Sequence, residues 1–180
     1  MIHLFLADGF EEIEALATLD VLRRCGLVVK TISCAGTRTV MGAHNIPVLA
    51  DEIFRGGDYA ESDALILPGG MPGAKNLLEH EGLHKALVAQ NERGALVAAI
   101  CAAPMVLGQH GILAGRKATC YPGFEQMLTG AEHLTDYVVE DGNVITGKGP
   151  AAAVEFGFAI ASRFVSPAKV AEVRSGMLFA

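Results

Sequence analysis

Short apolar runs alternate along this chain with longer segments of helical pattern. Ile2–Leu6, Ala64–Leu67 and Leu96–Ile100 are runs of this kind, and each ends at a turn or at the start of a helix. Strands that are buried on both faces have such near-continuous apolar sequences, because helices cover a parallel sheet on both sides. The alternation predicts an α/β fold in which a doubly wound parallel sheet is sandwiched between helices.

The other elements are predicted from hydrophobic period, helix caps and turn residues. They are helices over Glu11–Cys25, Leu83–Arg93 and Ala151–Phe164, a strand over Leu27–Ser33, and a short terminal helix that opens at Pro167. Two hairpins are also expected. A small β-hairpin joins Thr39–Met41 to Pro47–Ala50, and Asp141-Gly142 turns between Tyr137–Glu140 and Asn143–Thr146.

Length and charge restrict the class of protein. The 180 residues suit one domain, and we expect residues 1–180 to form it. The formal net charge of −6 argues against a nucleic-acid partner. From Gly94 to Gly115 the chain carries no charge, and this stretch is long enough for a membrane helix. Pro104 and Gly108 interrupt this stretch, so we interpret it as a buried strand, turn and helix, and expect no membrane partner.

Cysteine and histidine spacing gives no sign of a metal site. The four cysteines form neither a CxxC pair nor a zinc pattern. No secretory signal is visible, so we expect free thiols and the reducing cytoplasm. His80 and His84 lie among charged neighbours, which favours a solvated helix face over a ligand pair. We predict no metal and no cofactor.

Candidate functional residues follow the ends of three strands, where ligands of doubly wound sheets bind. The most specific is Cys101, which lies between a buried strand and a helix and has alanines on both sides. Small neighbours suit a sharp nucleophile elbow, and the amino end of a helix lowers the pKa of a thiol. The alternative is a buried structural cysteine. The other three, Cys25, Cys34 and Cys120, are interpreted as core or half-exposed residues without a role in chemistry.

Acidic residues and glycines follow the other two strands. Glu14 is the expected acid/base partner of the thiol, whereas Glu11 and Glu12 are interpreted as helix-dipole partners. Gly69 and Gly70 form a loop whose amides can approach a ligand, and the Gly70 and Ala102 amides can form an oxyanion hole. A plain glycine turn is the equal alternative.

Two nucleotide motifs are rejected. Residues 142–148 match the spacing of a phosphate-binding loop, but Gly149 replaces the required Ser/Thr and Val144–Thr146 reads as strand. The glycines at 69, 70 and 73 lack the spacing of a dinucleotide site.

Four motifs in a fixed order carry a resemblance to a known family: GFEEIE at 9–14, LPGG at 67–70, AICA at 99–102 and KGP at 148–150. The chain resembles the ThiJ/PfpI superfamily, in the branch of the parkinsonism-associated protein deglycase (DJ-one), from Ile2 to about Ala171. This resemblance implies a flavodoxin-like sandwich and a homodimer. It further implies Cys101 as nucleophile and redox-sensitive thiol, Glu14 as its protonated partner, and the Gly70 and Ala102 amides at the oxyanion.

Two positions depart from the family pattern. Peptidase-like members carry histidine after the cysteine, where this chain has Ala102, so peptidase activity loses support. The deglycase branch often carries a histidine before proline near the thiol, and Tyr121-Pro122 occupies that place. Tyrosine is a poor base at neutral pH but can donate a hydrogen bond to a substrate.

Three functions are therefore weighed. The first is a cofactor-independent glyoxalase III or deglycase, in which Cys101 and Glu14 convert small 2-oxoaldehydes such as methylglyoxal to 2-hydroxy acids or repair glycated groups. The second is an oxidative-stress sensor or chaperone with an oxidisable Cys101. A cysteine peptidase or other hydrolase is less favoured.

Overall fold

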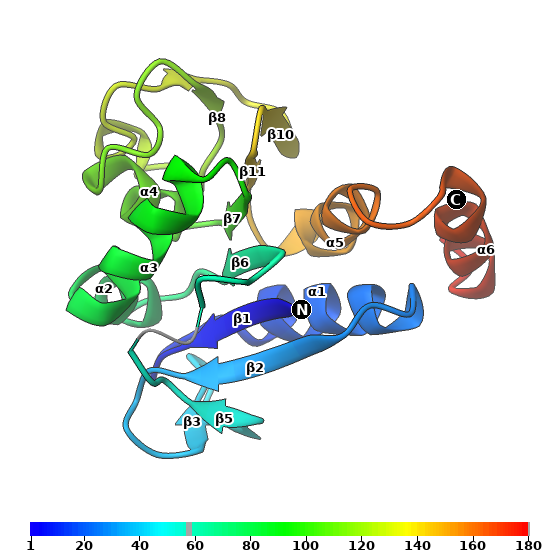
Figure 1. Ribbon diagram of the computed structural model, residues 1–180, viewed down its shortest axis with the longest axis horizontal. Helices are drawn as coiled ribbons and strands as arrows, with labels where there is room; N and C mark the ends of the chain where they lie inside the picture. The colour runs from blue at the N-terminus through cyan, green and yellow to red at the C-terminus, as the bar shows by residue number, and fades with distance from the viewer. Residues whose placement is uncertain (57–58, 180) are drawn as a thin grey trace.

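The computed structural model describes residues 1–56 and 59–179 and places a mixed sheet at the centre of an α/β sandwich (Figure 1). In spatial order its strands are β10 (Val138–Asp141), β11 (Val144–Gly147), β7 (Leu96–Ile100), β6 (Ala64–Leu67), β1 (Ile2–Leu6), β2 (Val29–Ser33) and β5 (Glu52–Ile53). All neighbouring pairs are parallel except β10 and β11, which form the predicted antiparallel hairpin. The fold is flavodoxin-like, as predicted.

Helices cover both faces of the sheet. On one face lie α1 (Glu12–Arg24) and α5 (Ala153–Ala161), and on the other lie α2 (Gly73–Leu78), α3 (Glu81–Glu92) and α4 (Pro104–Gln109). Each face has its own buried cluster, with Leu22 and Phe156 in one and Leu87 and Val106 in the other. The β strands between the two clusters are buried on both sides, which explains their continuous apolar sequences.

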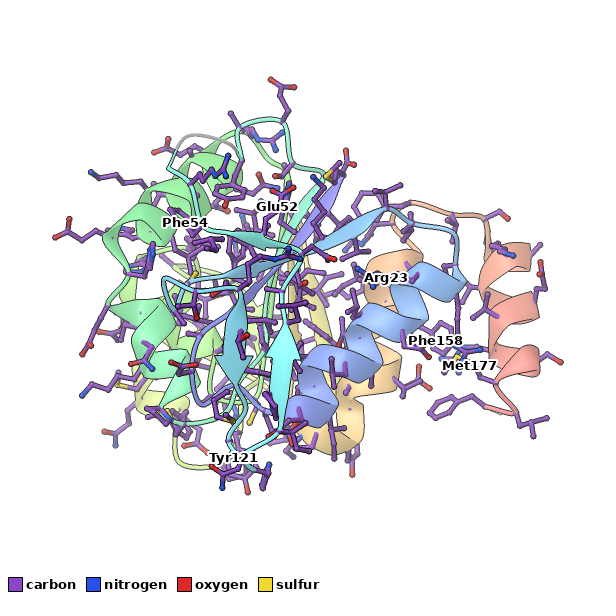
Figure 2. All side chains as sticks on the ribbon, turned by 90° about the horizontal axis from the view of Figure 1, so that it is seen from below. Arg23, Glu52, Phe54, Tyr121, Phe158 and Met177 are labelled. Atoms are coloured by element: carbon purple, nitrogen blue, oxygen red, sulfur yellow. The ribbon has the colours of Figure 1, made fainter. Side chains whose placement is uncertain are left out.

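The terminal helix α6 (Pro167–Gly176) stands at the side of the sandwich, next to α5. Figure 2 shows Phe158 of α5 and Met177 in the space between these two helices. The guanidinium of Arg174 lies 4.5 Å from the centre of the Phe158 ring, a cation–π contact that attaches α6 to the body.

Local hydrogen bonds explain where predicted boundaries were wrong. The strand predicted from Leu27 begins at Val29, because the Leu27 N–H closes the end of α1 on the Leu22 carbonyl. The helix predicted from Leu83 begins at Glu81, because the His80 Nδ1 caps it by accepting from the Leu83 N–H. His80 is therefore a helix cap rather than part of a solvated face.

Several short elements were not predicted, and α5 is shorter than expected. The helix expected over Ala151–Phe164 opens with a 3₁₀ turn at Pro150–Ala152, and α5 itself covers only Ala153–Ala161. The unpredicted elements are α2, β5, β8 (Lys117–Ala118), β9 (Glu132–His133) and a 3₁₀ turn at Glu125–Met127. The small hairpin is confirmed as β3 (Thr39–Met41) and β4 (Pro47–Leu49).

The uncharged stretch from Gly94 to Gly115 forms β7, a turn and α4, as predicted. Within residues 1–56 and 59–179, no helix has the length and apolar character needed to span a membrane.

The winding of the chain places the site. After β1 the chain enters α1 on one face, and after the neighbouring strand β6 it enters α2 on the opposite face. The carboxyl ends of β1 and β6 therefore border the crevice where the winding reverses, the usual ligand site of such sheets. One site residue follows each of the strands β1, β6 and β7: Glu14, Gly69 and Cys101 respectively. All three residues therefore lie at this edge of the sheet.

Candidate active site

Cys101 occupies a sharp turn between β7 and α4. Its φ is +66°, in the left-handed region that residues other than glycine rarely adopt. Two backbone hydrogen bonds hold the turn: the Cys101 N–H donates to the Gly147 carbonyl at 2.9 Å, and the Tyr121 N–H donates to the Cys101 carbonyl at 2.8 Å. The residue is 8% exposed. This is the strained elbow that the sequence predicted, with its thiol at the carboxyl edge of the sheet.

Glu14 lies in the first turn of α1 and is 1% exposed. Its Oε2 accepts a hydrogen bond from the Gly69 N–H at 2.8 Å, and its carboxyl shares a hydrogen bond with the Cys101 thiol. Its Oε1 is buried and receives no hydrogen bond from any described N–H group, so this oxygen is free to carry a proton. The structure therefore brings together the two residues that the sequence paired.

Positions 69 and 70 both require glycine, because a Cβ at either would overlap neighbouring atoms and because Gly70 has a positive φ. A Cβ at Gly69 would lie 2.6 Å from the Cβ of Cys101 and 2.7 Å from the Glu14 Oε2. Gly70 has φ of +86°, and its Cβ would lie 2.4 Å from the Glu11 nitrogen. The Gly70 and Ala102 N–H groups donate to the Cys101 sulfur, so both amides lie beside the atom that would attack a carbonyl group.

Burial dominates the protonation of this pair. It raises the pKa of Glu14 to about 7, although hydrogen bonds from Cys101 and Gly69 oppose the rise. Burial also raises the pKa of Cys101, and the charge and hydrogen bond of Glu14 raise it further, while the Gly70 and Ala102 amides lower it. The lowered thiol pKa expected from the sequence is therefore wrong. The helix end does act on the sulfur, but removal from water and a neighbouring carboxylate outweigh it.

The two groups titrate as one unit. The contribution of Glu14 to the pKa of Cys101 exists only while Glu14 is an anion, because a protonated carboxyl is neutral and can donate a hydrogen bond. After one proton has left, the single negative charge can lie on Glu14 or on the sulfur. The Gly70 and Ala102 amides stabilise the second arrangement.

Tyr121 contacts Cys101 with its backbone N–H and not with its side-chain hydroxyl. The residue is 47% exposed, and Figure 2 shows it at the surface of the molecule. Its ring packs on Gly149, where a Cβ would lie 3.2 Å from the ring. Among the described residues, no hydrogen-bond partner is found for the Tyr121 hydroxyl, so the structure does not bring it into contact with Cys101 or Glu14.

The other acidic residues of the first motif are bonded within the protein. The Glu11 side chain caps α1, where its Oε2 accepts from the Glu14 N–H at 2.7 Å. Both oxygens of Glu12 bond to His44, at 2.7 Å each. Ligand atoms of Glu11, Glu12 and His44 lie within 4.8 Å of one another, but these bonds already occupy the carboxylates. The sequence missed His44, which lies in the β3–β4 turn.

All four cysteines are free. Cys25 and Cys120 are buried and Cys34 is half-buried, as expected for residues without a role in chemistry. Burial raises the pKa of Cys34 to about 12 and that of Cys120 to about 11.

The model of the DJ-1/PfpI family matches residues 1–163 of this chain. The chain belongs to the DJ-1/PfpI family. Protein dj-1beta of Drosophila melanogaster is 37% identical over 177 residues, which cover 97% of this chain and 95% of that protein. Its crystal structure matches 99% of this chain and 97% of the compared chain, with a TM-score of 0.94.

Two further DJ-1/PfpI relatives bear on function. A Caenorhabditis elegans protein named glutathione-independent glyoxalase DJR-1.2 is 38% identical over 164 residues, which cover 90% of this chain and 87% of that protein. A solved structure described as oxidised DJ-1 of Toxoplasma gondii is 31% identical, covers 99% of this chain and 98% of its own, and has a TM-score of 0.93.

Proposed function

We propose that this protein is a cofactor-independent glyoxalase or deglycase, which converts small 2-oxoaldehydes such as methylglyoxal to 2-hydroxy acids. The observation that carries the proposal is the contact between the strained Cys101 thiol and a buried carboxyl whose pKa is raised to about 7. A carboxyl with this pKa can both accept and donate a proton at neutral pH. The relative named glyoxalase supports the same assignment.

The reaction begins with the arrangement that has a proton on Glu14 and the negative charge on Cys101. The thiolate attacks the aldehyde carbon and forms a C–S bond, while the carbonyl oxygen takes the charge and meets the Gly70 and Ala102 amides. Glu14 gives its proton to this oxygen, which completes the hemithioacetal and leaves Glu14 as a carboxylate. The carboxylate then removes the proton from the former aldehyde carbon, and the neighbouring carbonyl oxygen takes the charge as an enediolate.

The hydroxyl proton on the sulfur-bearing carbon passes to the enediolate oxygen, and Glu14 returns its proton to the neighbouring carbon, which gives a thioester with a hydroxyl group beside it. Water attacks the thioester, the C–S bond breaks, and the 2-hydroxy acid leaves with the thiol restored. The sum is the aldehyde plus one water giving the acid, so electrons balance within the substrate. No step needs a metal, an external thiol or an oxidant.

Lactate production from methylglyoxal without glutathione tests the proposal. We expect wild type and the Cys34→Ser control to produce lactate, and Cys101→Ser and Glu14→Gln to lose the activity. Lactate formation by Cys101→Ser at the wild-type rate would overturn the proposal.

A redox sensor is the second candidate function. Two amides already donate to the Cys101 sulfur, and the same donors would stabilise a sulfinate. The oxidised relative from Toxoplasma gondii favours this candidate. The homodimer and the cytoplasmic location stay predictions. The exposed Ile13 and Leu16 on α1 offer apolar area that a second copy can cover.

A further inference from the structure

A small cavity lies beside the elbow and is not explained by the chemistry at Cys101 and Glu14. It has a volume of about 190 Å³. Its walls are the tyrosines Tyr121 and Tyr137, the prolines Pro122 and Pro150, and the segment from Lys148 to Ala151. A closed apolar cavity of about 150 Å³ accepts a benzene molecule, so this pocket, which is open to solvent on one side, has the size of a phenyl ring.

Both walls of the cavity are attached to the nucleophile. On one side, the Tyr121 N–H donates to the Cys101 carbonyl. On the other, the Cys101 N–H donates to Gly147, the residue before Lys148. The Lys148 N–H donates in turn to the Tyr137 carbonyl at 2.9 Å, which ties the second tyrosine to the same wall. A group held here therefore has a fixed position relative to Cys101.

The lining suits a flat apolar group. Tyr121 and Tyr137 are 47% and 64% exposed, so part of each ring is available to a ligand. The charged side chain among the lining residues is Lys148, and its Nζ already donates to the Thr135 carbonyl at 2.9 Å. Aromatic rings pack on tyrosine faces in stacked or edge-to-face arrangements.

We infer that this cavity is a specificity subsite that holds an aromatic substituent of the 2-oxoaldehyde, with Tyr121 and Tyr137 as the residues that select it. The inference rests on the proposed function, since it names the substrate class of the same thiol. It also gives the ring of Tyr121 a role that does not depend on its hydroxyl.

Phenylglyoxal and methylglyoxal are the probes of substrate preference. In Tyr121→Ala, the ratio of kcat/KM for phenylglyoxal to that for methylglyoxal should fall by at least about tenfold, and Tyr137→Ala should lower the ratio in the same direction. Tyr121→Phe keeps the ring and should keep the ratio. Phe164→Ala, which removes an exposed ring at the opposite edge of the sheet, is the matched control.

Alkylation of Cys101 at the wild-type rate is the control that each variant keeps the elbow intact. Tyr121→Ala retains the backbone N–H that donates to the Cys101 carbonyl. An unchanged ratio in both alanine variants, with methylglyoxal still turned over, overturns the subsite and leaves the proposed function standing.

Protection of the thiol separates the two proposals. Mandelate and lactate are the unreactive 2-hydroxy acids that correspond to the two substrates. Mandelate should slow iodoacetamide alkylation of Cys101 at lower concentrations than lactate does, and Tyr121→Ala should remove the difference. This readout does not need turnover, so it supports the subsite even in a protein that turns over neither aldehyde. Equal protection by the two acids in wild type overturns it.

Discussion

The carboxylate of Glu11 accepts a hydrogen bond from the backbone N–H of Glu14, with 2.7 Å between donor and acceptor. One acidic residue thus caps the helix that presents the other to the thiol. The negative charge of Glu11 also contributes to the raised pKa of Glu14. Glu11 is a positioning residue, which stabilises the first turn of α1 and adjusts the protonation of the acid/base group.

Glu11→Ala should lower the free energy of unfolding by about 1 kcal/mol, the usual effect of losing a helix cap. It should also shift the lower limb of the pH–rate profile to lower pH, because a negative charge near Glu14 has gone. Glu11→Gln keeps an oxygen acceptor but no charge, so it should recover the stability and retain the pH shift. Urea unfolding and pH–rate profiles measure both, and equal profiles for all three proteins would contradict the role.

Glu14→Gln should separate thiol reactivity from turnover. The carboxylate raises the pKa of Cys101, so its replacement should move the midpoint of the pH–alkylation curve of Cys101 to lower pH. Turnover of methylglyoxal should fall by at least about 100-fold, the low end of a general acid–base contribution. Glu14→Asp should lose turnover too, because the shorter side chain withdraws the carboxyl. Turnover at the wild-type rate by Glu14→Gln would show that Glu14 is only a charge at the end of a helix and not the acid/base group.

The buried carboxyl makes stability depend on pH. The folded pKa of Glu14 is about 7, against an ordinary value of 4.5, so the folded protein holds a proton that the unfolded chain releases. The stability contributed by Glu14 therefore falls as pH rises from about 4.5 to about 7. The free energy of unfolding of wild type minus that of Glu14→Gln should decrease by about 2 kcal/mol between pH 5 and pH 8. Chemical denaturation at both pH values measures it, and a difference that rises with pH would be the wrong sign.

Gly69→Ala should damage both stability and activity. Its Cβ would contact the Cys101 Cβ, the Glu14 Oε2 and the Ile100 carbonyl at 2.6, 2.7 and 2.8 Å. Such overpacking lowers stability by about 1–3 kcal/mol, and it pushes the catalytic pair apart. Gly176→Ala is the control, because its Cβ would have no heavy atom within 4 Å. Wild-type turnover by Gly69→Ala would show that the glycine loop can move to accommodate a Cβ, which would contradict the requirement for glycine at this position.

Mild peroxide should add oxygen to Cys101 before the other thiols, since only this sulfur among the described cysteines has two amides donating to it from the elbow and the glycine loop. Peptide mapping by mass spectrometry measures the order. Cys34 is the informative comparison because it is the half-buried thiol. Oxidation of Cys34 first would remove the structural basis for a sensor.

The sequence predicted those parts of the fold and site that depend on local pattern. Ala64–Leu67 and Leu96–Ile100 are strands with the predicted ends, because apolar runs between turn residues mark buried strands. Cys101 and Glu14 were paired because each follows a strand of one parallel sheet. β5 was missed because it has two residues, and its place depends on pairing with β2 rather than on its own sequence.

The missed parts of the site depend on contacts between distant segments. The thiol pKa was predicted with the wrong sign, since the helix end is visible in sequence whereas the burial of Glu14 against the sulfur is not. Tyr137 was predicted only as a strand residue. The Lys148 N–H donates a hydrogen bond to the Tyr137 carbonyl, and this bond brings Tyr137 to the elbow. The bond forms only once the two strands of the hairpin are paired.

The φ of +66° at Cys101 has a consequence for how this protein can be improved. A residue with a side chain in that region holds about 1–3 kcal/mol of strain, and glycine would release most of it. Backbone conformation alone therefore favours glycine at the elbow, whereas the reaction needs the side chain that glycine lacks. At this one position the backbone and the chemistry require different residues.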